Sequence, residues 1–350
     1  TLTGTISASH SQDVIIPLTI SGTAGLNDYS TAFATKGVKT IAGGNGAGNA
    51  LNQFNGPHDL TVDSSGNIYV ADQSNGRIMK WAPGATEGVS IISASSPRGI
   101  DIDSSGNIYV SFNYEIKKYT PSGESFTEST VAGGNGSGNA LNQLNASTGI
   151  DVDGSGNIYV ADRANHRIMK WAPGATVGVL VAGGNSNGSD LNQLNNPYDV
   201  SVDSSGNVYA SDYYNHRVMK WAPGATEGVS ILGYAYHPMG IDLDNFGNIY
   251  IAHYHWHTVK KYTLSNGTYS SSTIIMGALN SNGSSSTQLS YPYFVNVNSS
   301  GNVYVSDSQN NRVQKLQVAP QIKIAAGATS GTVTFTSLSD FDDEEDETII

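Results

Sequence analysis

The segment VDSSGNIYVAD, residues 62–72, decides the fold because near-copies of it occur throughout the chain. These copies are IDSSGNIYVSF (102–112), VDGSGNIYVAD (152–162), VDSSGNVYASD (202–212), LDNFGNIYIAH (243–253) and VNSSGNVYVSD (297–307). Their turn glycines lie 40 to 54 residues apart, at Gly66, Gly106, Gly156, Gly206, Gly247 and Gly301. A repeat of this length indicates the blades of a β-propeller.

Each copy predicts four short antiparallel strands joined by tight turns. In the first copy the strands are expected at Leu60–Asp63, Asn67–Ala71, Arg77–Trp81 and Val89–Ile92. Gly66 in the first turn can adopt a positive φ, and β-branched and aromatic residues fill the second strand. No helical period is present. The sequence therefore predicts an all-β fold, a six-bladed β-propeller with four-stranded blades.

The ends of the repeat region predict how the ring closes. The sixth copy reaches its third strand at residues 311–316 and lacks a fourth. Val38–Ala42 (VKTIA) precedes the first copy and matches the fourth-strand segments Thr130–Ala132 and Leu180–Ala182. We expect this N-terminal strand to complete the last blade, which would remove an unpaired sheet edge.

The repeats resemble NHL repeats, which are named for an Asn-His-Leu signature. Asn165-His166-Arg167 and Asn215-His216-Arg217 stand at that signature, with Arg in the third place. The resemblance covers residues 38–317 and implies that this part of the chain is one NHL-type propeller domain.

Residues 1–30 and 319–350 do not fit the repeat. They resemble the two parts of a Calx-beta domain, an immunoglobulin-like β-sandwich. The shared elements are Gly22-Thr23-Ala24, Asp28-Tyr29, the turn AGATSGT at residues 326–332 and an acidic cluster after it. The resemblance implies that the propeller is inserted in one loop of a split sandwich. A closed propeller has adjacent termini, so such an insertion is geometrically easy.

The expected sandwich is incomplete, which leaves two interpretations open. The chain is a piece of a longer polypeptide, or a strand from a neighbouring subunit fills the gap. Val14, Ile16, Leu18 and Ile20 alternate along one strand, so one of its faces needs cover. We expect strand addition between the sandwich and another copy of the chain or an adjacent domain. A stable soluble monomer at high concentration would contradict self-assembly.

The acidic run Asp340–Glu347 holds seven carboxylates in eight residues, which repel one another unless a cation neutralises them. The Calx-beta resemblance implies Ca²⁺ as a cofactor, bound by Asp28, Asp340 and Glu344 with Asp342 and Asp343 as neighbours. The alternative is a solvated acidic loop. We expect EDTA to lower the melting temperature of the sandwich and Asp340→Ala with Glu344→Ala to remove that sensitivity. An unchanged melting profile would favour the solvated loop.

Two further patterns favour structural roles. Asp-x-x-Asn-x-Arg occurs four times, as in Asp162/Asn165/Arg167, and a catalytic site is rarely repeated so often. We expect its carboxylate to cap the turn between the second and third strands and to pair with Arg.

His253, His255 and His257 would share one face of a strand and suit zinc or nickel. Their alignment with the other repeats places them on a turn instead.

The start of each inner strand is expected to line a mouth of the central channel. The candidate ligand-binding residues there are His58, Asp59, Arg98, Tyr198, Asp199 and Tyr293. Some NHL enzymes cleave hydroxyglycine amides with a zinc ion held by channel histidines. Only His58 and the nearby His237 are available here, which is too few ligands. We therefore favour a binding role over the alternative function, which is a propeller hydrolase or lyase with a channel metal.

Three Gly-rich segments are interpreted as connections between blades. They are residues 43–55, 133–145 and 183–195, and we expect Leu51, Leu141 and Leu191 to pin them. A phosphate-binding loop would need a following Lys-Ser or Lys-Thr, which is absent. Their Asn, Gln and Gly content suits contacts with a glycan or protein ligand.

Composition narrows the function. Asp+Glu is 29 against Lys+Arg 17, a formal net charge of −12, which argues against a nucleic-acid partner and against attraction to anionic lipid. No cysteine is present, and no apolar run approaches the roughly 20 residues of a membrane span. We therefore expect a non-enzymatic extracellular or cell-surface protein for adhesion or assembly, with the propeller displayed on a calcium-binding sandwich.

Overall fold

The computed structural model describes residues 2–5, 14–17, 36–317, 321–324 and 330–333. The chain divides into two compact units. One contains the repeats, Val38–Ser299 and Val303–Lys315, and the other contains the two ends of the chain. Each unit is considered by itself.

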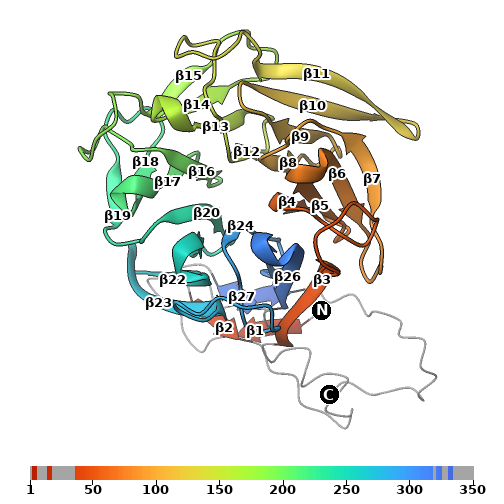
Figure 1. The fold of residues 1–350 in the computed structure, drawn as a ribbon. Coiled ribbons are helices and arrows are strands. Elements are labelled where there is room, and N and C mark those ends of the chain that lie inside the picture. Colours follow the sequence, from red (N-terminus) through yellow and green to blue (C-terminus); the bar gives the residue numbers. More distant parts are fainter. Residues whose placement is uncertain (1, 6–13, 18–35, 318–320, 325–329, 334–350) are drawn as a thin grey trace, which may run out of the picture. The chain divides into compact units, whose positions relative to one another are not determined.

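The repeat unit is a six-bladed β-propeller, as the sequence predicts, with six four-stranded antiparallel sheets around a central channel (Figure 1). Blade 1 is β4 (Pro57–Val62), β5 (Ile68–Asp72), β6 (Arg77–Trp81) and β7 (Val89–Ser93). Blade 2 is β8 (Ile100–Ile102), β9 (Ile108–Ser111), β10 (Glu115–Ser122) and β11 (Ser125–Gly133). Blade 3 is β12 (Ile150–Val152), β13 (Ile158–Asp162), β14 (Arg167–Trp171) and β15 (Val179–Gly183). Blade 4 is β16 (Pro197–Val202), β17 (Val208–Asp212), β18 (Arg217–Trp221) and β19 (Val229–Leu232). Blade 5 is β20 (Pro238–Leu243), β21 (Ile249–His253), β22 (Thr258–Ser265) and β23 (Thr268–Gly277).

Blade 6 closes the ring with a strand from the other end of the repeat region. Its sheet order is β24 (Pro292–Val297), β25 (Val303–Asp307), β26 (Arg312–Gln317) and then β3 (Lys36–Gly43). The backbone N–H of Gly44 also donates to the carbonyl of Asn311 at 2.9 Å. The predicted closure by Val38–Ala42 is therefore confirmed, and it pairs a strand edge that would otherwise be open.

Five blades have a short 3-10 helix between the second and third strands. These are η1 (Gln73–Asn75), η2 (Arg163–Asn165), η3 (Tyr213–Asn215), η4 (Tyr254–Trp256) and η5 (Ser308–Asn310). The residue after each helix adopts the left-handed conformation, and in three blades that residue is a histidine: His166, His216 and His257. Each of these histidines accepts a hydrogen bond at Nδ1 from a backbone N–H that leads into the next blade, for example from Asn196 to His166 at 3.1 Å.

The hydrophobic core is divided among the seams between blades. The cluster between blades 1 and 2, for example, packs Ala71 and Ile78 with Ile100 and Val110. Three tryptophans, Trp81, Trp171 and Trp221, are each only 1% exposed, and burying side chains of this size contributes strongly to stability. Each blade is therefore held by packing against its neighbours in the ring.

The chain ends form two small antiparallel pairs among the described residues. β1 (Leu2–Thr5) pairs with β28 (Ser330–Val333), and β2 (Val14–Pro17) pairs with β27 (Gln321–Ile324). The two ends of the chain thus pair with each other. The expected sandwich is not seen: these described segments make two-stranded sheets only, and they give no evidence of a Calx-beta domain.

Candidate functional site

The first strand of each blade lines the central channel with a regular pattern. Counting from Pro57 and its counterparts, the third residue is Asp or Gly in five blades, and the fifth is Asp wherever the third is Gly. The carboxylates that result are Asp59, Asp101, Asp151, Asp199 and Asp242, which line a cavity of about 80 Å³. Blade 6 has Phe294 and Asn296 at these positions.

Each channel carboxylate bonds to the backbone of the next blade. Asp59 accepts from the N–H of Ile100 at 2.9 Å, and Asp101 accepts from the N–H of Val152 at 2.8 Å. Equivalent bonds join Asp151 to Val202, Asp199 to Ile241, and Asp242 to Val297. The carboxylates therefore link neighbouring blades across five successive seams. This gives Asp59 and Asp199 a structural role.

Glycine is required where a neighbouring carboxylate approaches the strand. A Cβ atom on Gly149 would lie 1.8 Å from Oδ1 of Asp199, far inside van der Waals contact. A side chain there would push blade 4 away from blade 3. The glycine at this seam is therefore required by packing against Asp199.

The channel carboxylates are hard to ionise. Burial raises the pKa of Asp101 to about 6 and that of Asp242 to about 7. Burial also raises the pKa of Asp59, Asp151 and Asp199 well above the usual range, and the neighbouring channel carboxylates raise it further. Removing a carboxylate from water penalises its charged form, and nearby like charges add to the penalty.

A channel mouth rich in aromatic and cationic side chains lies where the inner strands begin and the second strands end. We define it by His58, Arg98, Arg163, Tyr198, Tyr213, Tyr254 and Tyr293. The ring of His58 lies 4.9 Å from that of Tyr293, which lies 5.1 Å from that of Tyr254. The ring of Tyr198 lies 5.0 Å from that of Tyr213. These side chains come from all six blades, and the closed ring brings them together.

Two arginines of the channel mouth have no acidic partner among the described residues. Nη1 of Arg163 donates to the hydroxyl of Tyr198 at 2.9 Å, and its guanidinium lies 5.1 Å from the centre of the Tyr198 ring. The Nε atoms of Arg98 and Arg163 are buried without a hydrogen-bond partner. Burial, and then the charge of Arg163, lowers the pKa of Arg98. The other four arginines of the chain each pair with an aspartate at 2.7 Å.

The histidines do not converge on a metal. Burial, and then the charge of Arg98, lowers the pKa of His58 to about 3, so this ring is neutral at physiological pH. His253 is buried and hydrogen-bonds the Tyr236 carbonyl and the Tyr262 hydroxyl, both at 3.0 Å. His257 accepts the N–H of Tyr291. Within the described ranges no group of three His, Cys, Asp or Glu side chains is placed to hold a metal ion.

The repeated Asp-x-x-Asn-x-Arg pattern clamps the loop that enters its own blade. In blade 3 the Oδ2 atom of Asp162 accepts from Arg167 Nε at 2.7 Å and from Asn165 at 2.8 Å. Arg167 also donates to the carbonyls of Asn139, Ala140 and Gln143. The predicted pairing with Arg is confirmed. The predicted cap is wrong, because the carboxylate makes no cap bond to the turn and instead accepts the loop N–H of Asn145.

The anchors of the Gly-rich loops differ from those predicted. Leu51, Leu141 and Leu191 are about half exposed, at 46%, 51% and 47%. The buried anchors are three residues further on, at Phe54, Leu144 and Leu194, with Leu289 in a fourth loop of the same kind. Each loop turns back on itself, as the bridge between Ala47 and Phe54 shows, so the later apolar residue enters the seam.

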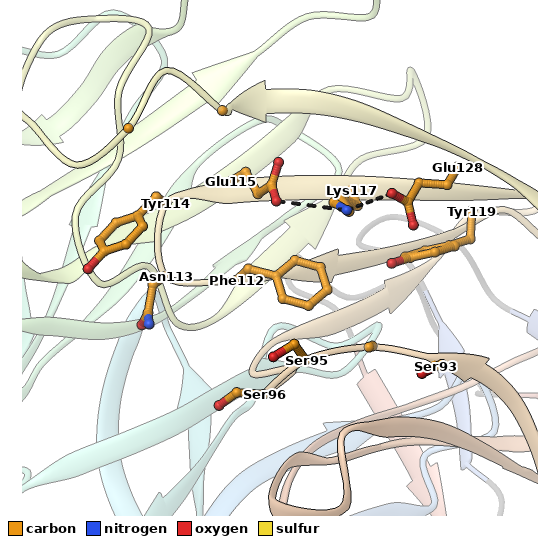
Figure 2. Close-up of a pocket in the computed structure, with 13 residues that line it drawn as sticks. Ser93, Ser95, Ser96, Phe112, Asn113, Tyr114, Glu115, Lys117, Tyr119 and Glu128 are labelled. Atoms are coloured by element: carbon orange, nitrogen blue, oxygen red, sulfur yellow. Dashed lines mark hydrogen bonds and ion pairs between the residues drawn. The ribbon is translucent and has the colours of Figure 1, made fainter.

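A second concave site lies between blades 1 and 2. It has a volume of about 500 Å³ and is lined by Phe112, Tyr114, Glu115, Lys117, Tyr119 and Glu128 with small residues from the facing segments (Figure 2). We call it the seam pocket. Sequence reasoning missed it, and it missed Arg163, Tyr213 and Tyr254 at the mouth. The available signal was position: each of these three directly follows the Asp or His that ends the second strand.

The fold and these sites define a class of protein, the six-bladed propellers. The model of the NHL repeat matches residues 54–81, 148–171, 194–221 and 289–316. The chain therefore carries an NHL-repeat six-bladed β-propeller. No curated protein matches the sequence.

Solved structures share this fold at low sequence identity. A structural-genomics protein of unknown function from Bacteroides thetaiotaomicron is 14% identical, with a TM-score of 0.63 over 81% of this chain and 76% of that one. An auxiliary nutrient binding protein from Bacteroides ovatus is 12% identical, with a TM-score of 0.60 over 80% and 76%. Virginiamycin B lyase from Staphylococcus aureus is 14% identical, with a TM-score of 0.51 over 85% and 99%. At these identities the likeness concerns the fold alone.

Several expectations fall outside the part of the chain that the structure describes. Asp28, Asp340, Asp342, Asp343 and Glu344 lie in undescribed segments, so calcium binding stays a prediction. Among the described residues there is no helix of the length and apolarity that crossing a bilayer requires.

Proposed function

We propose that this protein is a non-enzymatic extracellular binding protein whose propeller captures carboxylated glycans at the channel mouth. The observation that carries the proposal is the pair Arg98 and Arg163, which have no acidic partner among the described residues and stand among tyrosine rings. Guanidinium groups bind carboxylates through strong, charge-assisted hydrogen bonds. Tyrosine rings offer flat apolar faces with polar edges, which suits the two kinds of surface on a sugar ring.

The electrostatics of the mouth support an anionic ligand. The charge of Arg163 helps to lower the pKa of Arg98, and both arginines leave buried Nε atoms unpaired, which is costly. An incoming carboxylate would satisfy the unpaired donors and screen the two charges from each other. His58 is neutral at physiological pH, so the positive charge of the mouth comes from the two arginines. The channel carboxylates are committed to backbone N–H groups and are protonated more readily than usual.

The test is binding of oligogalacturonate by isothermal titration calorimetry, with its methyl ester as the uncharged comparison. Arg98→Met and Arg163→Met keep the apolar stems and remove the charged heads. Hydrogen bonds to charged groups contribute about 1.5–3 kcal/mol each, so each variant should raise the Kd about 10- to 100-fold. Lys39→Met, at an exposed position of β3, is the matched loss of one charge and should leave the Kd unchanged.

Other outcomes would replace this proposal. Equal affinity for the acid and its methyl ester would show that the arginines do not select a carboxylate. An acidic peptide that binds with the same arginine dependence would point to a protein ligand. Breakdown of the oligosaccharide during titration would favour the alternative function, a propeller hydrolase or lyase.

A further inference from the structure

At four of the six seams between blades, a loop fills the space, and each of these loops buries one apolar anchor residue. The loops precede blades 1, 3, 4 and 6, and their anchors are Phe54, Leu144, Leu194 and Leu289. In blade 1 the anchor Phe54 packs in one cluster with Met79 of β6. Leu144 and Leu194 share clusters in the same way with Met169 and Met219. In blades 1, 3 and 4 a buried methionine on the third strand is thus covered by the loop that enters the blade.

Blades 2 and 5 have no such loop, and their sequences change at the positions that would hold it. By strand register, Phe112 of blade 2 takes the place of the clamping aspartate, and Glu115 takes the place of the clamping arginine. Lys117 takes the place of the buried methionine, because it pairs with Val110 as Met79 pairs with Val70. The clamp and the loop are therefore lost together.

The two blades without a loop differ in what fills the space. In blade 5 the rings of Tyr236 and Trp256 stack 5.3 Å apart, and His253 bonds the carbonyl of Tyr236. Lys260, which holds the methionine position there, lies 4.4 Å from the Trp256 ring. In blade 2 no side chain replaces the loop, and the seam pocket of about 500 Å³ is left. This volume lies within the range of about 300–1,000 Å³ typical of small-molecule sites.

The seam pocket presents both hydrogen-bond donors and acceptors beside aromatic walls. Nζ of Lys117 lies 2.6 Å from Oε1 of Glu128 and 3.9 Å from Oε1 of Glu115 (Figure 2). Phe112 and Tyr114 lie in the same pocket, and Tyr114 is 44% exposed. The hydrogen bond to Glu128 raises the pKa of Lys117, and the same bond lowers the pKa of Glu128, so both groups are charged at neutral pH.

This chemistry selects among ligand classes. Two carboxylates against one ammonium disfavour an anion. A peptide that binds as the loops of the other blades do is disfavoured too. The arginine, asparagine and aspartate that bind the loop backbone in those blades are absent from blade 2. A neutral ligand with many hydroxyl groups can both donate to the glutamates and accept from the lysine, and can pack a ring face on Phe112 or Tyr114.

We propose that the seam pocket between blades 1 and 2 is a second binding site, for a neutral saccharide unit. Glu115, Lys117 and Glu128 bond its hydroxyl groups, and Phe112 and Tyr114 form its apolar walls. The site uses none of the residues that define the channel mouth, so either site can fail without the other.

The experiment screens the full chain against neutral gluco-, galacto- and manno-oligosaccharides by saturation-transfer NMR and then measures Kd by calorimetry. Lys117→Met installs the residue that blades 1, 3 and 4 carry at this position and should weaken binding at least tenfold. Lys260→Met makes the same change in blade 5, where aromatic rings fill the seam, and should leave the affinity unchanged. Arg163→Met should also leave it unchanged, which separates this site from the mouth.

The results that would overturn the proposal are distinct. The proposed saccharide site would be refuted if none of the neutral oligosaccharides bound at millimolar concentration. It would also be refuted if Lys117→Met did not alter the binding. Binding of the peptide GGNGSGNALNQLN, the loop sequence of residues 133–145, in competition with sugar would show that the pocket accepts a loop instead.

Discussion

Replacing Asp162 by Ala should lower the free energy of unfolding by about 3–5 kcal/mol, the cost of breaking a buried ion pair by removing one partner. The side chain of Asp162 is fully buried and accepts three hydrogen bonds, from Asn145, Asn165 and Arg167. Its loss would leave the guanidinium of Arg167, 7% exposed, without its counter-charge and would release the loop that precedes blade 3. The melting temperature should fall by roughly 10 °C.

Thermal unfolding followed by circular dichroism checks this result. Glu87→Ala removes a carboxylate at an exposed position and serves as the control, with an expected change within about 0.5 kcal/mol. Asp72→Ala, Asp212→Ala and Asp307→Ala should match Asp162→Ala, because their blades carry the same clamp. A loss below about 1 kcal/mol for Asp162→Ala would mean that the clamp is not a stabilising element.

The second large effect is a fall in stability as the pH rises from about 4 to about 7. The channel carboxylates have a higher pKa in the folded protein than the usual 3.8, with Asp101 at about 6 and Asp242 at about 7. The folded state therefore binds more protons than the unfolded state in this range, so unfolding becomes easier with rising pH. At about 1.4 kcal/mol per pKa unit, Asp242 alone accounts for a change on the order of 4 kcal/mol.

Urea unfolding at a series of pH values from 4 to 8 measures this dependence. Hydrogen bonds lower the pKa of Asp63, Asp103 and Asp153, so their stabilisation is lost only as the pH falls below about 4, outside this window. Burial raises the pKa of Asp162, Asp212 and Asp307, so these groups add to the fall in stability with rising pH. Asp242→Asn removes one of the titrating groups and copies Asn296 of blade 6, so it should reduce the fall in stability by about 4 kcal/mol and leave the part that the other channel carboxylates contribute. Stability that rises between pH 4 and pH 7 would contradict the assigned protonation of the channel.

The strand order and ring closure were predictable because the same sequence pattern recurs in every repeat. The turn Asp63–Gly66 and the alternation in Ile68–Asp72 recur six times, and Val38–Ala42 matches internal fourth strands. The pairing of Arg with Asp in the repeated motif was predictable as well, because the two residues face each other across one hairpin. The hairpin features depend on neighbours close in the chain. Ring closure joins strands from opposite ends of the repeat region, and it was predictable because the N-terminal segment matches the fourth strand that the last repeat lacks.

The channel and the two candidate sites were decided by contacts between blades. The sequence by itself determined a six-bladed propeller whose last blade is completed by the N-terminal strand, and it pointed to His58, Arg98, Tyr198 and Tyr293 at the inner strands. Only the tertiary structure placed Arg163 beside Tyr198, turned Phe54 instead of Leu51 into the core, and left a pocket where blade 2 lacks a loop. The physical reason is that closing a ring brings together side chains from separate repeats, and seam packing decides which of them are buried, bonded or left open.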